Sequence, residues 1–201
     1  MRYEGPVLTM RTLELADEAF ILELFADWTY DGKRFTAARA EKAMGKWLND
    51  MAVQPAERPC TSTSLFREAI VIEDASGPIG LYVRVVRGSE VNGNKSGLNE
   101  SELETLALIP AKRNQGIVGA EFATIGTRFT FEIMGVDVMI MPEIADTPEL
   151  RTITSNRGFT DGPTKNTPRG LRNSASFSRS AWEARVAANP DEGAARFVFT
   201  P

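Results

Sequence analysis

The chain contains no histidine and a single cysteine, Cys60. The absence of histidine excludes Ser-His-Asp and Cys-His catalysis, histidine-ligated metals and imidazole proton shuttles. One cysteine forms neither an intrachain disulfide nor a cysteine-rich zinc site, and it is typical of a reducing compartment. We therefore expect a cytoplasmic protein that holds no metal. If the protein is an enzyme, its general base must be a carboxylate.

Long apolar runs and an excess of positive charge are also missing. No run approaches the roughly 20 apolar residues that span a membrane. The 23 Lys and Arg residues stand against 27 Asp and Glu, a net charge of −4, whereas a nonspecific nucleic-acid binder needs a basic field. We expect neither a membrane nor a nucleic acid as partner. The 201 residues suit one domain that folds without a disulfide or metal.

The spacing of the apolar residues predicts both strands and helices. Strands are expected over residues 7–15, 68–73, 79–86, 103–109, 136–141 and 175–178, with prolines 110 and 142 ending two of them. Helices are expected after Asp17, over residues 36–51, after Gly116, and over residues 148–156 and 181–188. This order indicates an α/β or α+β domain built around a mixed sheet.

The most informative segment joins the strand over residues 103–109 to the helix after it. Residues 108–118 read LIPAKRNQGIV, in which a strand and a proline lead to Arg-x-x-Gly at the start of a helix. This segment resembles motif A of the GCN5-related N-acetyltransferases (GNATs), with Val118 where the family has Gly or Ala. The resemblance implies a GNAT fold, with a mixed sheet of about six to seven strands and helices on both faces.

The resemblance extends along most of the chain. The strand and helix near the N-terminus, the Gly158-Phe159 pair, and the strand and Trp182-Glu183 near the C-terminus follow the family's order. The last of these is similar to the branch that acetylates the N-termini of ribosomal proteins. We expect a single GNAT-like domain over residues 1–201, with a core at about 7–188 and a C-terminal tail at 189–201.

A turn that contains glycine and leads into a helix is also a physical candidate for a phosphate site. Its free N–H groups and the positive end of the helix dipole suit a pyrophosphate, and Gly116 allows close approach. Arg113 would add a charged hydrogen bond, although an ordinary turn with a solvated Arg113 is the alternative. The bulkier Val118 would crowd the phosphate. The resemblance implies acetyl-CoA as co-substrate, bound by Leu106, Leu108, Arg113, Asn114, Gln115, Gly116, Ile117, Val118 and Gly119.

Acyl transfer to an amine needs a base, and a group that protonates the leaving thiolate. The resemblance places Glu102 where one branch of the family carries its catalytic Glu. Glu104 follows about 7 Å further on the same strand face. Both are alternatively solvated residues at a strand end. Thr154 stands where the family often has a Tyr acid, and the neighbouring Ser155 offers a second hydroxyl.

These features predict an acyl-CoA-dependent N-acyltransferase that moves an acetyl group to a primary amine by direct attack. The acceptor class stays open between a protein N-terminus, a lysine and a small molecule. The alternative is a catalytically degenerate GNAT-fold protein that binds partners within a larger assembly, such as a phage particle, and is then virion-associated. A homodimer or an assembly partner fits either hypothesis.

Overall fold

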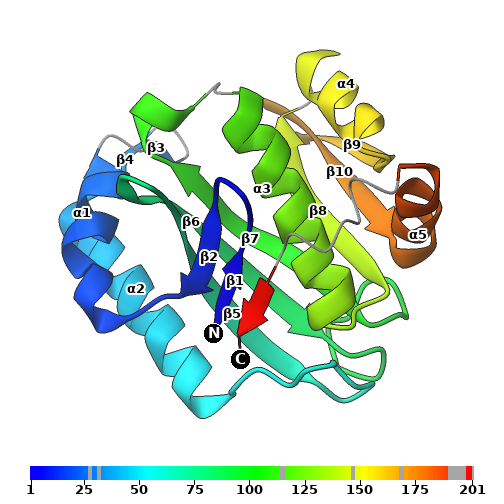
Figure 1. Ribbon diagram of the computed structural model, residues 1–201, viewed down its shortest axis with the longest axis horizontal. Helices are drawn as coiled ribbons and strands as arrows, with labels where there is room; N and C mark the ends of the chain where they lie inside the picture. Colours follow the sequence, from blue (N-terminus) through cyan, green and yellow to red (C-terminus); the bar gives the residue numbers. More distant parts are fainter. Residues whose placement is uncertain are drawn as a thin grey trace.

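The computed structural model describes residues 1–26, 29–30, 33–113, 116–145, 148–167, 170–189 and 198–200. Its main element is one mixed sheet of 9 strands in the order β11-β1-β2-β5-β6-β7-β8-β10-β9 (Figure 1). The strands are β1 (Arg2–Glu4), β2 (Thr9–Thr12), β5 (Leu65–Asp74), β6 (Gly77–Arg87), β7 (Glu100–Leu108), β8 (Val138–Ala145), β9 (Thr160–Thr167), β10 (Gly170–Ser178) and β11 (Val198–Thr200). Two short strands, β3 (Thr29–Tyr30) and β4 (Lys33–Arg34), form a separate hairpin.

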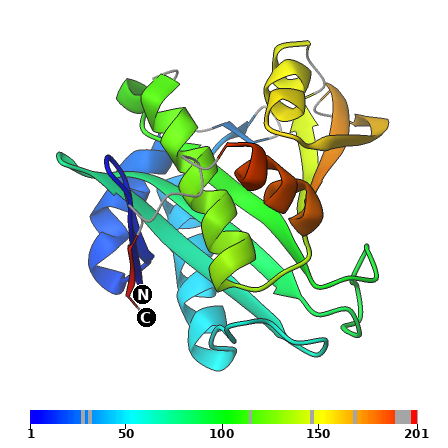
Figure 2. The same ribbon diagram turned by 45° about the vertical axis from the view of Figure 1, so that its right-hand side comes forward.

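Helices cover both faces of the sheet, as predicted (Figures 1 and 2). The helices are α1 (Glu18–Ala26), α2 (Ala37–Val53), α3 (Gly116–Arg128), α4 (Pro148–Asn156) and α5 (Arg179–Ala188), with short 3-10 turns η1 (Leu15–Asp17) and η2 (Pro110–Lys112). Helices α1 and α2 bury Phe25 and Trp47 against one face. Helices α3 and α5 bury Ile125 and Trp182 against the other. The fold class predicted from the sequence is confirmed.

The ends of several helices follow directly from the sequence. Thr36 caps α2 by accepting a hydrogen bond from the Arg39 amide, and Ser178 caps α5 through the Ala181 amide. Helix α4 has the predicted bounds, and two residues beyond its end lies Gly158, whose φ of +87° favours glycine. The chain folds as expected where the local signals are strong.

The sheet has more strands than the six or seven expected. The additional strands are β1, β9 and β11, and β1 and β11 lie outside the core range 7–188. Strand β9 is polar and exposed along most of its length, and it pairs only with β10 at the sheet edge. Short or polar edge strands lack the apolar alternation on which the prediction depended.

The prediction that Pro142 ends its strand is wrong, because β8 continues to Ala145. Beyond Ile140, β8 has no paired residue on the β7 side. On the β10 side, the register shifts between Met141 and Ile144. A proline in such an irregular stretch interrupts no regular ladder of hydrogen bonds.

Helix α3 continues at its C-terminal end into a π-turn, η3 (Phe129–Ile133). Under this turn lies Arg84 of β6, which has no exposed surface. Its Nη1 donates to the Thr130 hydroxyl, while Nε and Nη2 have no hydrogen-bond partner among the described residues. Burial lowers the pKa of Arg84. Nothing in the sequence pattern predicts a buried arginine at this place.

The part of the chain that the structure describes has neither a membrane-spanning helix nor a metal-binding cluster. No helix there is long and apolar enough to cross a membrane. No cluster of three or more Cys, Asp or Glu side chains there has the arrangement needed to hold a metal ion. Cys60, the single cysteine, is a buried free thiol.

Candidate active site

Strands β7 and β8 are parallel neighbours that separate after a short paired stretch. Their register runs from Glu100 and Val138 only as far as Glu102 and Ile140. Beyond that point β7 pairs with β6 alone and β8 with β10 alone. The remaining backbone groups of β7 on the β8 side therefore have no strand partner among the described residues. We call this unpaired stretch between β7 and β8 the opening (strands labelled in Figure 1).

Backbone alternation shows which groups of β7 face this opening. The Ile109 amide donates to the Ile79 carbonyl at 2.9 Å, so Ile109 and Ala107 bond toward β6. In an antiparallel ladder the residues between them direct their N–H and C=O groups the other way. The amides of Leu106 and Leu108 therefore face the opening. Leu106 and Leu108 are two of the residues that the family resemblance assigned to binding of acetyl-CoA.

A bulge lies in β7 just before these residues. Val83 is paired with Thr105 and the adjacent Arg84 with Leu103, so Glu104 is the extra residue on β7. A bulge bends the strand and changes the direction of the backbone groups beyond it.

The turn between β7 and α3 is tied to its surroundings on both sides. Arg113 Nε donates to the Leu108 carbonyl at 2.8 Å. Lys112 Nζ lies 2.5 Å from the Asp74 carboxylate. Helix α3 begins at Gly116, so its first N–H groups have no partner within the helix. The predicted site residues Asn114 and Gln115, and the side chains of Ile117 and Val118, lie outside the described residues.

Glu102 lies in the last residue pair before β7 and β8 separate. Its Oε2 accepts from Arg87 Nη1 at 2.9 Å and from Lys95 Nζ at 2.7 Å. The side chain is 17% exposed. Its partner in β6 is Val85, two residues from Val83, which packs on the α1–α2 side of the sheet. Glu102 is therefore a partly exposed, ion-paired carboxylate on that face.

Glu104, the extra residue of the bulge, lies on the same face. Its Oε1 accepts from Trp47 Nε1 at 3.2 Å and its Oε2 from Arg67 Nε at 2.8 Å. Glu102 thus pairs with two cations, Arg87 and Lys95, and Glu104 with Arg67, and the two carboxylates share no described hydrogen-bond partner. No local sequence pattern indicates these partners, because Arg67 and Arg87 lie on other strands and Lys95 lies in the loop before β7.

The two predicted hydroxyl groups differ in their surroundings. Thr154 is buried in α4, and its hydroxyl donates to the Arg151 carbonyl at 3.1 Å. Ser155 is exposed. Neither residue shares a described hydrogen bond with Glu102 or Glu104.

The backbone near the opening fits the groups of an acyl-CoA. A thioester carbonyl needs hydrogen-bond donors, which the Leu106 and Leu108 amides offer. A diphosphate needs several N–H groups and a positive field, which the start of α3 offers. Arg113 is exposed beside this helix start and keeps donors beyond its bond to Leu108. The residues present are therefore compatible with this co-substrate.

The comparison with solved structures decides the fold family. A spermidine/spermine N-acetyltransferase from Vibrio cholerae, SpeG, solved with manganese ions, aligns with a TM-score of 0.60 over 89% of this chain and 96% of its own, at 18% identity. FdhC, described as a nucleotide-linked sugar GNAT, aligns with a TM-score of 0.67 over 94% of this chain and 97% of its own, at 12% identity. The chain has the GNAT fold.

Other comparisons add detail to this result. A structure of the Vibrio cholerae spermidine N-acetyltransferase in complex with CoA and spermine aligns with a TM-score of 0.61 at 18% identity, over 88% of this chain and 98% of its own. No family model and no curated protein matches the sequence. The likeness to the branch that acetylates ribosomal proteins stays a prediction.

Proposed function

We propose that this GNAT-fold protein transfers an acetyl group from acetyl-CoA to a primary amine. The observation that carries the proposal is the opening beyond Glu102 and Ile140. Along it lie the outward-facing amides of Leu106 and Leu108, and the chain then passes through η2 to the first turn of α3. The similar solved proteins include N-acetyltransferases, one of them with CoA bound.

In the proposed reaction the amine nitrogen attacks the thioester carbon directly. A C–N bond forms and the C–S bond breaks, so the products are an N-acetylated amine and CoA. The amides of Leu106 and Leu108 donate hydrogen bonds to the acyl oxygen as negative charge develops on it. The N–H groups at the start of α3 and Arg113 hold the diphosphate.

Proton transfer falls to the carboxylates, because the chain has no histidine. We assign the base to Glu102, acting through a water on the amine, since it lies where the strands separate. Arg87 and Lys95 hold its carboxylate in place. Ser155, the exposed hydroxyl of the predicted pair, relays a proton to the leaving thiolate, whereas the Thr154 hydroxyl bonds within α4.

Calorimetric titration of the full chain with acetyl-CoA tests the cofactor site. Gly116→Trp places an indole at the first residue of α3 and should abolish binding. Gly45→Trp is the matched control, because Gly45 lies on α2 and a Cβ there meets nothing within 4 Å. Micromolar binding that only Gly116→Trp removes supports the proposal. It then justifies an acceptor screen with peptide N-termini, lysine peptides and small amines.

Failure to bind at millimolar acetyl-CoA, with the protein shown to be folded, would reject the enzyme. The GNAT-fold protein would then be a binding component of an assembly. Its carboxylates would be structural, as the ion pairs Arg87–Glu102 and Arg67–Glu104 allow.

A further inference from the structure

Glu121 of α3 binds the turn of the N-terminal hairpin. Its Oε1 accepts from the Val7 amide at 2.6 Å and from the Leu8 amide at 2.8 Å. Both amides belong to the turn between β1 and β2, which lies beside α3 in Figures 1 and 2. Leu8 is fully buried, and a buried amide that loses its hydrogen-bond partner is costly. The contact therefore ties α3 to a segment that is far away in the sequence.

Glu121 lies close to the start of α3. It follows Gly116, the first residue of the helix, by five residues, which is about 7.5 Å along the helix axis. The N–H groups at this start are the donors to which the proposed function assigns the diphosphate. Any movement of the helix at Glu121 moves these donors with it. The turn between β1 and β2 therefore holds the proposed diphosphate site in place.

The next residue of α3 holds the helix against the sheet. The ring of Phe122 packs edge to face on the ring of Tyr82 in β6, with centroids 5.2 Å apart. Tyr82 pairs with Leu106 of β7, whose amide faces the opening. Phe122 thus fixes the height of α3 above the strands that border the opening, whereas Glu121 fixes the position of α3 toward the hairpin.

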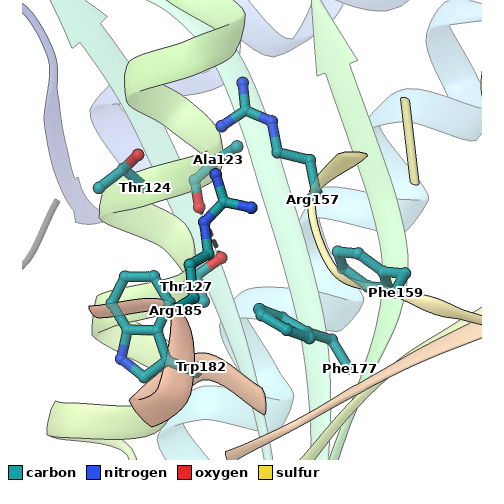
Figure 3. Close-up of a pocket in the computed structure, with 8 residues that line it drawn as sticks. All are labelled: Ala123, Thr124, Thr127, Arg157, Phe159, Phe177, Trp182 and Arg185. Atoms are coloured by element: carbon teal, nitrogen blue, oxygen red, sulfur yellow. Dashed lines mark hydrogen bonds between the residues drawn. The ribbon is translucent and has the colours of Figure 1, made fainter. Parts of the chain in front are cut away.

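Helix α3 is less closely packed on the side toward α4 and α5. A small pocket lies there, and its lining includes Ala123, Thr124 and Thr127 of α3, Arg157, which directly follows α4, and Arg185 of α5. Figure 3 shows both guanidinium groups beside α3 near Ala123. Because the pocket separates α3 from these neighbours, the position of the helix depends more strongly on Glu121 and Phe122.

An acyl-CoA carries its thioester and its diphosphate at the two ends of one pantetheine arm. Joined groups gain affinity only when both reach their sites at once. The acyl-oxygen donors of β7 and the first N–H groups of α3 must therefore be spaced to fit this arm. We propose that Glu121 is a positioning residue that sets this spacing by holding α3 to the turn between β1 and β2. This role rests on the proposed function, and Glu121 takes no part in the chemical step.

Three ligands separate positioning from a general loss of structure. Acetyl-CoA occupies both ends of the site, S-acetylpantetheine only the thioester end, and adenosine diphosphate only the diphosphate end. Calorimetry of the full chain measures the Kd of acetyl-CoA, and NMR titration measures the Kd of each fragment. Glu121→Ala should weaken the binding of acetyl-CoA about tenfold or more and leave the Kd of both fragments unchanged. A purely structural role would weaken all three ligands together.

Two further variants and a control define the contact. Glu121→Gln keeps an oxygen that can accept both hydrogen bonds, so its Kd for acetyl-CoA should stay close to that of wild type. Glu121→Asp keeps the charge on a shorter side chain and should fall between wild type and Glu121→Ala, and it replaces the alanine variant if that variant does not fold. Glu132→Ala removes a carboxylate from η3, where Glu132 pairs with Arg128 at 2.8 Å, and should change none of the three Kd values.

The positioning role and the proposed function fail in different ways. If wild type binds acetyl-CoA and Glu121→Ala changes all three Kd values equally, or none of them, the positioning role is overturned and the proposed function stands. A Kd for acetyl-CoA that is the same in Glu121→Asp and wild type would overturn it as well. If wild type binds none of the three ligands, the proposed function fails and the positioning role fails with it.

Discussion

The carboxylate of Asp74 and the ammonium group of Lys112 lie 2.5 Å apart. This ion pair joins the turn between β5 and β6 to η2, the turn that leads toward α3. Asp74 also accepts from the Ser76 amide at 2.8 Å. The ion pair therefore fixes η2, the segment before α3, to the end of β5.

Asp74→Asn should remove a pH-dependent part of the stability. The hydrogen bonds from Lys112 and Ser76 lower the pKa of Asp74 from 3.8 to about 2. The unfolded chain therefore binds the proton first, and the stabilisation is complete above pH 3.8 and lost as the pH falls toward about 2. Denaturant melts at neutral pH and at about pH 3 measure the free energy of unfolding of both proteins. The difference between wild type and the variant should be smaller at the lower pH. The same deficit at both values would contradict the prediction.

Glu102→Gln should lower kcat about 10²-fold or more, the range usual for a general base. The KM for acetyl-CoA should stay unchanged, because Glu102 is not assigned to its binding. Glu104→Gln should lower kcat less, since Trp47 and Arg67 already occupy both of its oxygens. Steady-state rates across pH, with thermal melts as a check on folding, measure both variants. Equal losses in the two would assign a shared, structural role.

Gly80→Ala should disturb the strand that borders the opening. A Cβ at Gly80 would lie 2.5 Å from Leu108 Cδ2 and 2.7 Å from the Ala107 carbonyl oxygen. We expect a loss of about 1–3 kcal/mol in the free energy of unfolding and a raised KM for acetyl-CoA. Gly45→Ala, with nothing within 4 Å of the added Cβ, should instead stabilise α2 by up to about 1 kcal/mol. Chemical denaturation measures the free energy of unfolding of both variants against wild type.

Arg84→Met should stabilise the protein by about 1 kcal/mol or more. Arg84 is fully buried, and two of its nitrogens have no hydrogen-bond partner among the described residues. Methionine keeps much of the volume and removes the cost of burying the charge. A denaturant melt shows whether the free energy of unfolding rises or falls. A large loss of stability would show that the guanidinium is compensated more fully than its bond to Thr130 indicates.

The sequence predicted elements well where the local signal was strong. The apolar stripe and threonine cap of α2, the hairpin of β5 and β6, and the glycine that ends α4 each depend on residues close in the chain. Strand β9 and the continuation of β8 beyond Pro142 depend on which strand lies alongside, and no local pattern carries that information.

The same limit applies to the candidate site. Residues 108–118 predicted the turn into α3, because a proline after a strand and Arg-x-x-Gly at the start of a helix are signals carried by neighbouring residues. The partners of Glu102 and Glu104 come from α2, β5, β6 and the loop before β7, so only the fold brings them together. Arg157, which directly follows α4, and Arg185 of α5 line one pocket that the sequence did not predict.

The short pairing between β7 and β8 has a mechanical consequence. The sheet consists of a six-strand block ending at β7 and a three-strand block of β8, β10 and β9, and only three residue pairs join them. Side chains of both blocks, such as Phe66 of β5 and Phe177 of β10, belong to one buried hydrophobic cluster. Side-chain packing on this face therefore holds the two blocks together where the backbone ladder does not.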